Sequence, residues 1–498
     1  MLRRLNLFFA FPLALLAGFA LSVSFPSASL WPMAFIGVAL LLWSLIGRKF
    51  WISVSLGFIA GAAFWLSLIQ WLTLYLGPVP WLALGILQAI FFAFGVGAIS
   101  LVLNRGPLRW PGHWGSFVIT PVLVAALWAS REALTSVWPY GGFSWGRLAQ
   151  SQSESPLVHT VSWVGTTGLS FLVALVAALI VQVLRRQRPV KFLAYPLIVL
   201  VALMIVPAFP VELSGTTRVL AVQGDSQAGL FDEHPPGTIL QDHIAGTLPY
   251  AGEDIDMVVW PENASDLDPS RSEVAAKSLT YVSEELSAPV VTGTITHPNE
   301  DEYYNSSIVW EHGAIQAQYD KIHPVPFAEY MPNRSFWRMF APDLVDLVAA
   351  DYTGGTRSNV LDVAGVPAGI SICFDITDDQ QAYDMIAGGA QIILVQTNNA
   401  DFGQTDENVQ QLAIARLRAV ETGRSVVNIS TVGTSAIISP DGSTLAALAP
   451  YEPGEMLDSV PLSTTVTPAM TVGRSVEISL AVISLLGLVL VLVHRRTN

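Results

Sequence analysis

The chain has 498 residues, of which 52% are hydrophobic and 13% charged, and its mean hydropathy is +0.50. Soluble proteins carry about a quarter charged residues, so this composition excludes an ordinary soluble enzyme and predicts several membrane spans of about 20 residues. The single cysteine, Cys373, excludes an intrachain disulfide and a cysteine-based zinc site. The net charge of −14 argues against a nucleic-acid partner, which would require a basic surface.

Long apolar runs in the sequence predict eight transmembrane helices. They lie near residues 5–23, 29–47, 51–76, 81–103, 116–134, 157–184, 191–210 and 475–493. No acidic or basic residue lies in the middle of a run, which argues against a transporter or proton pump, where ionisable groups line the pathway. We therefore predict a membrane domain with seven helices over residues 1–213, and an eighth helix with a short cytoplasmic tail over 474–498.

Charge is divided unevenly along the chain. The part up to Leu213 has three acidic residues, whereas residues 214–473 hold 35 acidic and ten basic residues, a net charge of −25. Twelve basic residues lie at alternate ends of the predicted spans, namely Arg3, Arg4, Arg48, Lys49, Arg105, Arg109, Arg185, Arg186, Arg188, Lys191, Arg495 and Arg496. The positive-inside rule places these ends and both termini in the cytoplasm, and the acidic domain outside, in the periplasm or its equivalent. A cleaved signal peptide is the alternative for the N-terminus, and it leaves the outer placement unchanged.

From about residue 216, short β-branched runs alternate with helical stretches, which predicts an α/β domain over 214–473. The predicted strands are 218–223, 257–260, 290–294, 307–310, 314–319, 369–372, 391–395, 425–429 and 434–438. The predicted helices are 272–287, 378–388 and 405–422, the last ending at Gly423. Asp441 and Gly442, between two apolar runs, indicate a hairpin.

Three reactive side chains, Glu262, Lys321 and Cys373, follow predicted strands, and the carboxyl ends of strands are where open α/β sheets place their sites. A thiol is mostly protonated at neutral pH, and a neighbouring ammonium with a carboxylate base would raise its thiolate fraction. Glu262 would take the thiol proton, while Lys321 and a backbone N–H such as that of Phe374 would stabilise an oxyanion. Glu329 would hold Lys321. Taken singly, each has a structural explanation: a packed cysteine, a helix-capping acid and a surface lysine.

Short motifs in a fixed order and spacing strengthen this interpretation. They are Val222-Gln223-Gly224, Trp260-Pro261-Glu262, Tyr319-Asp320-Lys321, Val325-Pro326-Phe327-Ala328-Glu329-Tyr330, Ile372-Cys373-Phe374-Asp375, Thr397-Asn398-Asn399-Ala400-Asp401-Phe402-Gly403, the helix 411–421 and the segment from Trp138-Pro139-Tyr140 onward. These motifs resemble the nitrilase, or carbon–nitrogen hydrolase, superfamily. Together with the membrane spans, nearly the whole chain resembles the apolipoprotein N-acyltransferase family.

The resemblance implies an αββα sandwich with a Glu-Lys-Cys triad and a ping-pong reaction at the outer face of the bacterial inner membrane. Cys373 would attack a phospholipid ester, expected to be the sn-1 ester of phosphatidylethanolamine, and form a thioester. The α-amino group of an apolipoprotein's N-terminal diacylglyceryl-cysteine would then accept the acyl chain. Glu262 would be the general acid and base and Lys321 the electrostatic stabiliser, with Glu329, Phe374 and Asp375 in support. The resemblance implies no metal and no cofactor.

The chain departs from the family pattern at three places. Phe374 and Asp375 stand where the family usually has Tyr-Glu, and Asp401 stands where it often has Trp. Phe231 is an imperfect candidate for an aromatic residue expected downstream of Gly224. These departures bear on substrate preference and rate more than on the class of reaction.

Residues 331–350 are rich in apolar side chains and predict either a lid that dips into the membrane interface or an ordinary packed helix. Two alternative functions are compatible with the sequence. One is a membrane-tethered amidase of the nitrilase superfamily that acts on a small amide, although tethering needs only one span. The other is a catalytically inactive scaffold, against which the intact triad argues.

Overall fold

The computed structural model describes residues 5–186, 189–226, 229, 234–299, 301–348 and 350–493. Six residues named above lie outside these ranges, namely Arg3, Arg4, Arg188, Phe231, Arg495 and Arg496. The chain forms two compact units, one made of Met1–Phe209 with Pro468–Asn498 and the other of Pro210–Thr467. We call them the membrane unit and the catalytic unit.

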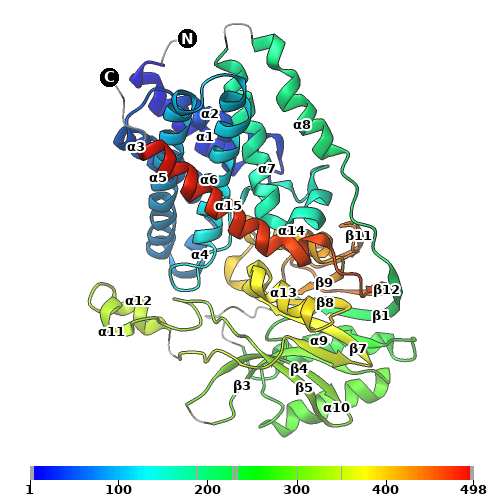
Figure 1. The fold of residues 1–498 in the computed structure, drawn as a ribbon. Helices are drawn as coiled ribbons and strands as arrows, with labels where there is room; N and C mark the ends of the chain where they lie inside the picture. The colour runs from blue at the N-terminus through cyan, green and yellow to red at the C-terminus, as the bar shows by residue number, and fades with distance from the viewer. Residues whose placement is uncertain are drawn as a thin grey trace. The chain divides into compact units, whose positions relative to one another are not determined.

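The membrane unit is helical (Figure 1). Among the described residues, five helical segments are long and apolar enough to cross a membrane: Phe50–Leu68 (α3), Pro78–Arg109 (α5), Gly115–Thr135 (η1 and α6), Val158–Leu184 (η3 and α7) and Pro468–Val493 (α15). Three shorter apolar helices are Leu7–Ser22 (α1), Pro32–Ser44 (α2) and Val190–Met204, which contains α8 (Ala194–Met204). The chain is therefore a multi-pass membrane protein. Length and composition support five of the eight predicted spans, and the other three stay a prediction.

Small residues let the membrane helices approach closely. Gly57 and Gly61 lie four residues apart on α3 and face α5. A Cβ atom at Gly57 would lie 2.8 Å from the Cβ of Val96, and one at Gly61 would lie 3.0 Å from the Cβ of Phe92. Because lipid tails are as apolar as the side chains, such close packing is a main source of helix association in a membrane.

The catalytic unit contains two six-stranded sheets. The first sheet has the order β12-β1-β2-β3-β4-β5, with bounds Gly454–Ser463, Leu213–Gln223, Met257–Val259, Val290–Thr296, Tyr304–Glu311 and Ala314–Asp320. The second has the order β11-β10-β9-β8-β7-β6, with bounds Thr444–Ala447, Ala436–Ile438, Ser425–Ser430, Ile392–Thr397, Val366–Ile372 and Val360–Val363. Strands β1, β2 and β3 pair in parallel, as do β7, β8 and β9.

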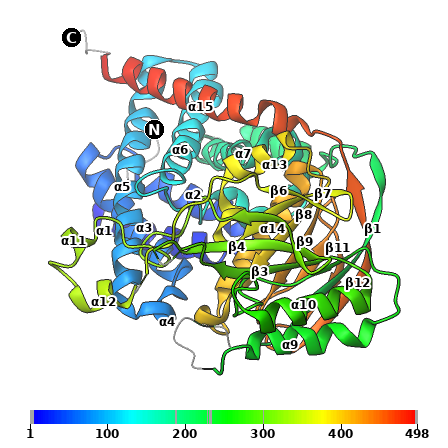
Figure 2. The ribbon, with the colours of Figure 1, turned by 90° about the horizontal axis from the view of Figure 1, so that it is seen from below.

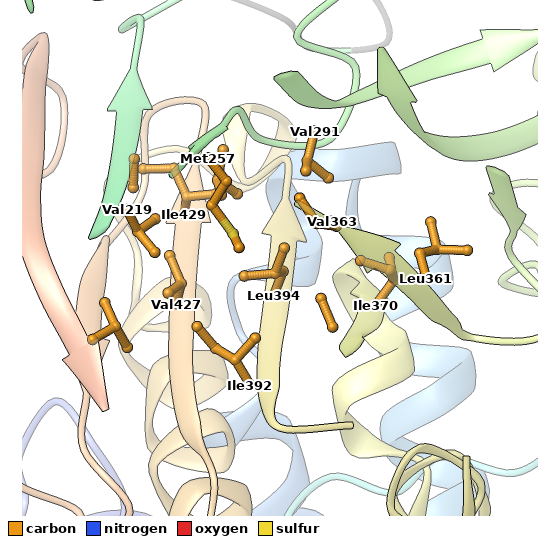
Figure 3. Close-up of a cluster of buried hydrophobic side chains, with 14 of the residues drawn as sticks. Val219, Met257, Val291, Leu361, Val363, Ile370, Ile392, Leu394, Val427 and Ile429 are labelled. Carbon is orange, nitrogen blue, oxygen red and sulfur yellow. The ribbon is translucent and has the colours of Figure 1, made fainter. Parts of the chain in front are cut away.

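Most residues of the central strands β2, β3, β4, β7, β8 and β9 are buried, and alternate side chains of a strand enter different cores. In β1, Val219 and Ala221 enter the core between the sheets, whereas Leu220 and Val222 enter the core under the helices. Figure 3 shows part of the core between the sheets, with Val219 from the first sheet and Leu394 from the second. Helices α9 (Thr238–Thr247) and α10 (Glu273–Leu286) cover the first sheet, and α13 (Asp379–Ala387) and α14 (Asp406–Thr422) cover the second (Figures 1 and 2). The layers are therefore α, β, β and α, as expected.

All nine predicted strands and all three predicted helices of this unit are present. Gly423, at φ +67°, ends α14 in the left-handed conformation that glycine favours. The predicted hairpin joins β10 and β11, which pair antiparallel on either side of Asp441 and Gly442. Strands β6, β11 and β12 and helix α9 were not among the predicted elements.

Candidate active site

The structure brings Glu262, Lys321 and Cys373 into one site. Glu262 lies three residues after β2, Lys321 directly after β5, and Cys373 directly after β7. Each acts electrostatically on the pKa of another member of the trio. Because β2 and β5 belong to the first sheet and β7 to the second, one sheet supplies the acid and the amine while the other supplies the thiol.

The Glu262 carboxyl group is buried and accepts two hydrogen bonds. Asn305 Nδ2 donates to Oε1 at 2.7 Å, and the backbone N–H of Asn398 donates to Oε2 at 2.8 Å. Burial raises the pKa of Glu262 to about 7, with a contribution from Glu329, although Lys321 and the two hydrogen bonds act to lower it. A carboxyl group with a pKa near neutrality can both accept and return a proton at physiological pH.

Lys321 is almost fully buried and is held by Glu329. Its Nζ atom lies 3.0 Å from Oε1 and 2.9 Å from Oε2 of Glu329. Burial acts to lower the pKa of Lys321, but the negative charges of Glu329, Cys373 and Glu262 outweigh it and raise that pKa above its ordinary value. The side chain is therefore an ammonium at any physiological pH. The predicted contact with Glu329 is present, and the catalytic roles of both residues stay predictions.

Cys373 lies where β7 passes into a short 3-10 helix, Cys373–Thr377 (η6). Its φ of +53° is unusual for a side chain with a Cβ atom, and such strained residues cluster at functional sites. Burial raises the pKa of the thiol well above its ordinary value, Glu262 and Glu407 add to the effect, and Lys321 opposes it. Lys321 acts in the expected direction, although burial has the larger effect on the pKa of the thiol. The thiol therefore needs a base when it reacts.

Asp375 and Phe374, the other predicted supporting residues, lie in the first turn of η6. Asp375 is buried and its Oδ2 accepts from the hydroxyl of Tyr319 at 3.0 Å and from the backbone N–H of Ile372 at 3.3 Å. Burial raises the pKa of Asp375 to about 6, while Lys321 acts to lower it. Asp375 thus ties the turn that carries the thiol to β5, the strand before Lys321. Phe374 is half-buried, and its role as an oxyanion donor stays a prediction.

Asn305, which lies on β4 opposite Lys321, is a site residue that the sequence did not predict. Its side-chain Nδ2 donates to Glu262 Oε1 at 2.7 Å and to Glu329 Oε1 at 2.8 Å, and its backbone carbonyl oxygen accepts from the backbone N–H of Lys321 at 2.8 Å. One amide therefore sets the relative position of both carboxyl groups. No motif in the sequence marks this residue.

The segment 331–348 has one packed side and one exposed side. It contains two short helices, Arg334–Trp337 (α11) and Pro342–Leu347 (α12). Met331, Val345 and Val348 are buried together. Four apolar side chains are exposed, Phe336, Met339, Phe340 and Leu347. Exposed apolar clusters of this kind mark contact with another molecule or a membrane.

Two family models match the chain. The apolipoprotein N-acyltransferase N-terminal domain matches residues 17–179, and carbon-nitrogen hydrolase matches residues 221–467. The second match, with two six-stranded sheets between helical layers, defines the catalytic unit as a nitrilase-like domain. An amidase of the nitrilase superfamily from Nesterenkonia is a solved structural neighbour, 17% identical with a TM-score of 0.40 over 51% of this chain and 94% of that chain.

The curated relatives match both units of the chain. The apolipoprotein N-acyltransferase of Mycolicibacterium smegmatis is 32% identical over 96% of this chain and 84% of the relative. Those of Shewanella oneidensis and Pseudomonas putida are each 26% identical, over 93% and 95% of this chain and 92% and 95% of theirs. The chain belongs to the apolipoprotein N-acyltransferase family.

Proposed function

We propose that this chain transfers an acyl chain from a membrane phospholipid to the α-amino group of the N-terminal diacylglyceryl-cysteine of a lipoprotein. The observation that carries the proposal is the convergence of Glu262, Lys321 and Cys373 in a chain whose relatives match it along both units. The neutral thiol with a carboxyl group of pKa about 7 nearby suits acyl transfer through a thioester.

In the first half-reaction, Cys373 Sγ attacks the ester carbonyl carbon while Glu262 takes the thiol proton. The ammonium of Lys321 stabilises the negative oxygen of the tetrahedral intermediate. The intermediate then expels the glycerol oxygen, which receives the proton from Glu262. The products are a thioester on Cys373 and a lysophospholipid. We propose the sn-1 ester of phosphatidylethanolamine as the donor.

In the second half-reaction, the free amine of the lipoprotein attacks the thioester carbonyl carbon. Glu262 accepts a proton from the attacking nitrogen, Lys321 again stabilises the oxyanion, and the C–S bond breaks. The thiolate of Cys373 then takes the proton from Glu262. The amide product leaves, and the residues return to their first protonation states. A pKa near neutrality lets Glu262 accept and donate in turn.

We propose that all eight apolar segments cross the membrane, with both termini in the cytoplasm and residues 214–473 on the periplasmic side of a bacterial inner membrane. The 13 residues of α2 reach only about 20 Å, so the apolar residues that flank the helix would complete the span. The described basic residues at alternate ends of the segments, such as Lys49 and Arg105, support this orientation.

Orientation can be measured with a membrane-impermeant maleimide. Lys277 and Lys49 are both exposed lysines, one in the catalytic unit and one in a predicted cytoplasmic loop. In a Cys373→Ala background, Lys277→Cys should be labelled in intact spheroplasts and Lys49→Cys only after lysis. The reverse pattern would contradict the orientation.

The reaction itself can be tested with the purified full-length protein, phosphatidylethanolamine and a diacylated lipopeptide, followed by mass spectrometry. We expect the lipopeptide to gain one acyl chain and the enzyme to carry a thioester adduct when the lipopeptide is omitted. Cys373→Ala should lose both. Hydrolysis of small amides without acylation of the lipopeptide would instead favour the amidase.

A further inference from the structure

A second polar network lies beside Cys373 and is not used by the mechanism above. Gln411 Nε2 donates to Cys373 Sγ across 3.8 Å, and Gln411 Oε1 accepts from Asn399 Nδ2 at 2.8 Å. Asn399 Nδ2 also donates to Glu407 Oε2 at 2.7 Å. Asn399, Glu407 and Gln411 are all buried. Glu407 and Gln411 lie four residues apart on α14, so they share one face of the helix.

The network determines which end of the Gln411 amide meets the sulfur. The backbone N–H of Gly433 donates to Ser430 Oγ at 2.9 Å, which leaves the hydroxyl hydrogen of Ser430 for Asn399 Oδ1 at 2.6 Å. The oxygen of Asn399 therefore faces Ser430, and its NH2 group faces Gln411. Gln411 consequently turns its own oxygen to Asn399 and its NH2 group to the thiol of Cys373.

A second donor would favour the thiolate because Lys321 alone does not offset the effect of burial on the thiol. Lys321 Nζ lies 2.9 and 3.0 Å from the two carboxyl oxygens of Glu329, and its charge does not outweigh the burial of the thiol. When the sulfur loses its proton, a neutral N–H···S contact becomes a charge-assisted one, which is roughly twice as strong. A fixed amide dipole in a buried site costs no reorganisation when the charge develops.

We propose that Gln411 is a further catalytic residue, whose amide NH2 group stabilises the Cys373 thiolate, and that Asn399 is a positioning residue that orients this amide. The inference rests on the proposed function only in taking Cys373 as the nucleophile. It requires no particular acyl donor or acceptor.

The single cysteine of the chain makes the test direct, because iodoacetamide can alkylate no other thiol. In the full-length protein, Gln411→Leu should lower the alkylation rate of Cys373 at pH 7 about tenfold and raise the apparent thiol pKa by about one unit. Gln410→Leu is the matched control, because Gln410 is also buried but points about 100° away around α14. It should alkylate at nearly the parental rate. The assay needs no lipid, so its outcome is independent of acyl transfer.

The role of Asn399 can be separated by a double-mutant cycle. Asn399→Leu should slow alkylation less than Gln411→Leu does, and the double variant should be no slower than Gln411→Leu alone. Gln411→Met, which also lacks a donor, should behave as Gln411→Leu and serves if the leucine variant does not fold. A folded Gln411 variant with the parental pH profile of alkylation would overturn the proposal. Fully additive effects of the two substitutions would overturn the role of Asn399.

Discussion

The substitution Asn305→Leu tests how the structure sets the protonation of Glu262. Leucine is similar in size to asparagine but cannot donate the 2.7 Å hydrogen bond to Glu262 Oε1. A hydrogen bond to a charged group contributes about 1.5–3 kcal/mol, and about 1.4 kcal/mol corresponds to one pKa unit. The pKa of Glu262, about 7 in the parent, should therefore rise by about one to two units.

At neutral pH, the Asn305→Leu variant should therefore have less of the ionised Glu262 that acts as the base. The ionised fraction of Glu262 at pH 7 should fall from about one half to between roughly one and ten per cent. The assay is single-turnover formation of the thioester from phosphatidylethanolamine, measured from about pH 5.5 to 9.5 with the full-length protein in detergent. The acidic limb of the pH–rate profile should move up by one to two units, and much of the rate should return at high pH.

Asn359→Leu provides a control for general damage to the unit. Asn359 is equally buried, and its Nδ2 donates to the carbonyl oxygen of Gln381 and to no residue of the triad. This variant should keep the acidic limb in place, whatever its thermal stability. If Asn305→Leu loses rate uniformly at every pH, with the limb still near pH 7, the reasoning about Glu262 is refuted.

Three further predictions follow from other contacts. Glu329→Gln leaves the buried ammonium of Lys321 without its counter-charge, so it should lower the melting temperature and slow thioester formation at least tenfold, measured by calorimetry and single-turnover kinetics. Burial raises the pKa of Glu407 to about 8, so the stability that its bound proton provides is present at low pH and is lost as pH rises toward 8. Between about pH 5 and 9, the melting temperature of Glu407→Gln should therefore fall less than that of the parent. An equal fall in both proteins would contradict this. Phe340→Asp should slow acylation from phosphatidylethanolamine vesicles several-fold and leave iodoacetamide alkylation unchanged, whereas Leu445→Asp, also at an exposed apolar residue, should affect neither.

The sequence predicts the central strands of the catalytic unit well because strands such as β2, β8 and β9 are buried along their whole length and are therefore mostly apolar. It fails at β12, where Asp458 and Pro461 interrupt the apolar pattern. That strand lies at the edge of its sheet, where a proline costs no ladder hydrogen bond on the open side. Pairing with β1 therefore decides its structure, and this pairing joins segments that are far apart in the chain.

Asn305 shows why part of the site could not be read from the sequence. The turn at His312 and Gly313 joins β4 to β5, and the first residue pair beside the turn is Glu311 opposite Ala314. Counting back from that pair would place Tyr304, not Asn305, opposite Lys321. A bulge at Gln316 of β5, opposite Val309 and Trp310, shifts the register by one residue and brings Asn305 to the two carboxyl groups. No pattern in the local sequence predicts this bulge.

The division of the site between two sheets has a consequence for the life of the chain before it is fully folded. Glu262, Asn305 and Lys321 come from one sheet and Cys373 from the other. Until the apolar faces of the sheets dock, the cysteine is an ordinary solvated thiol with no base or ammonium beside it. In a newly made chain, or in one with a damaged core, these side chains therefore do not form one site. Assembly of the sandwich is therefore required before the site exists.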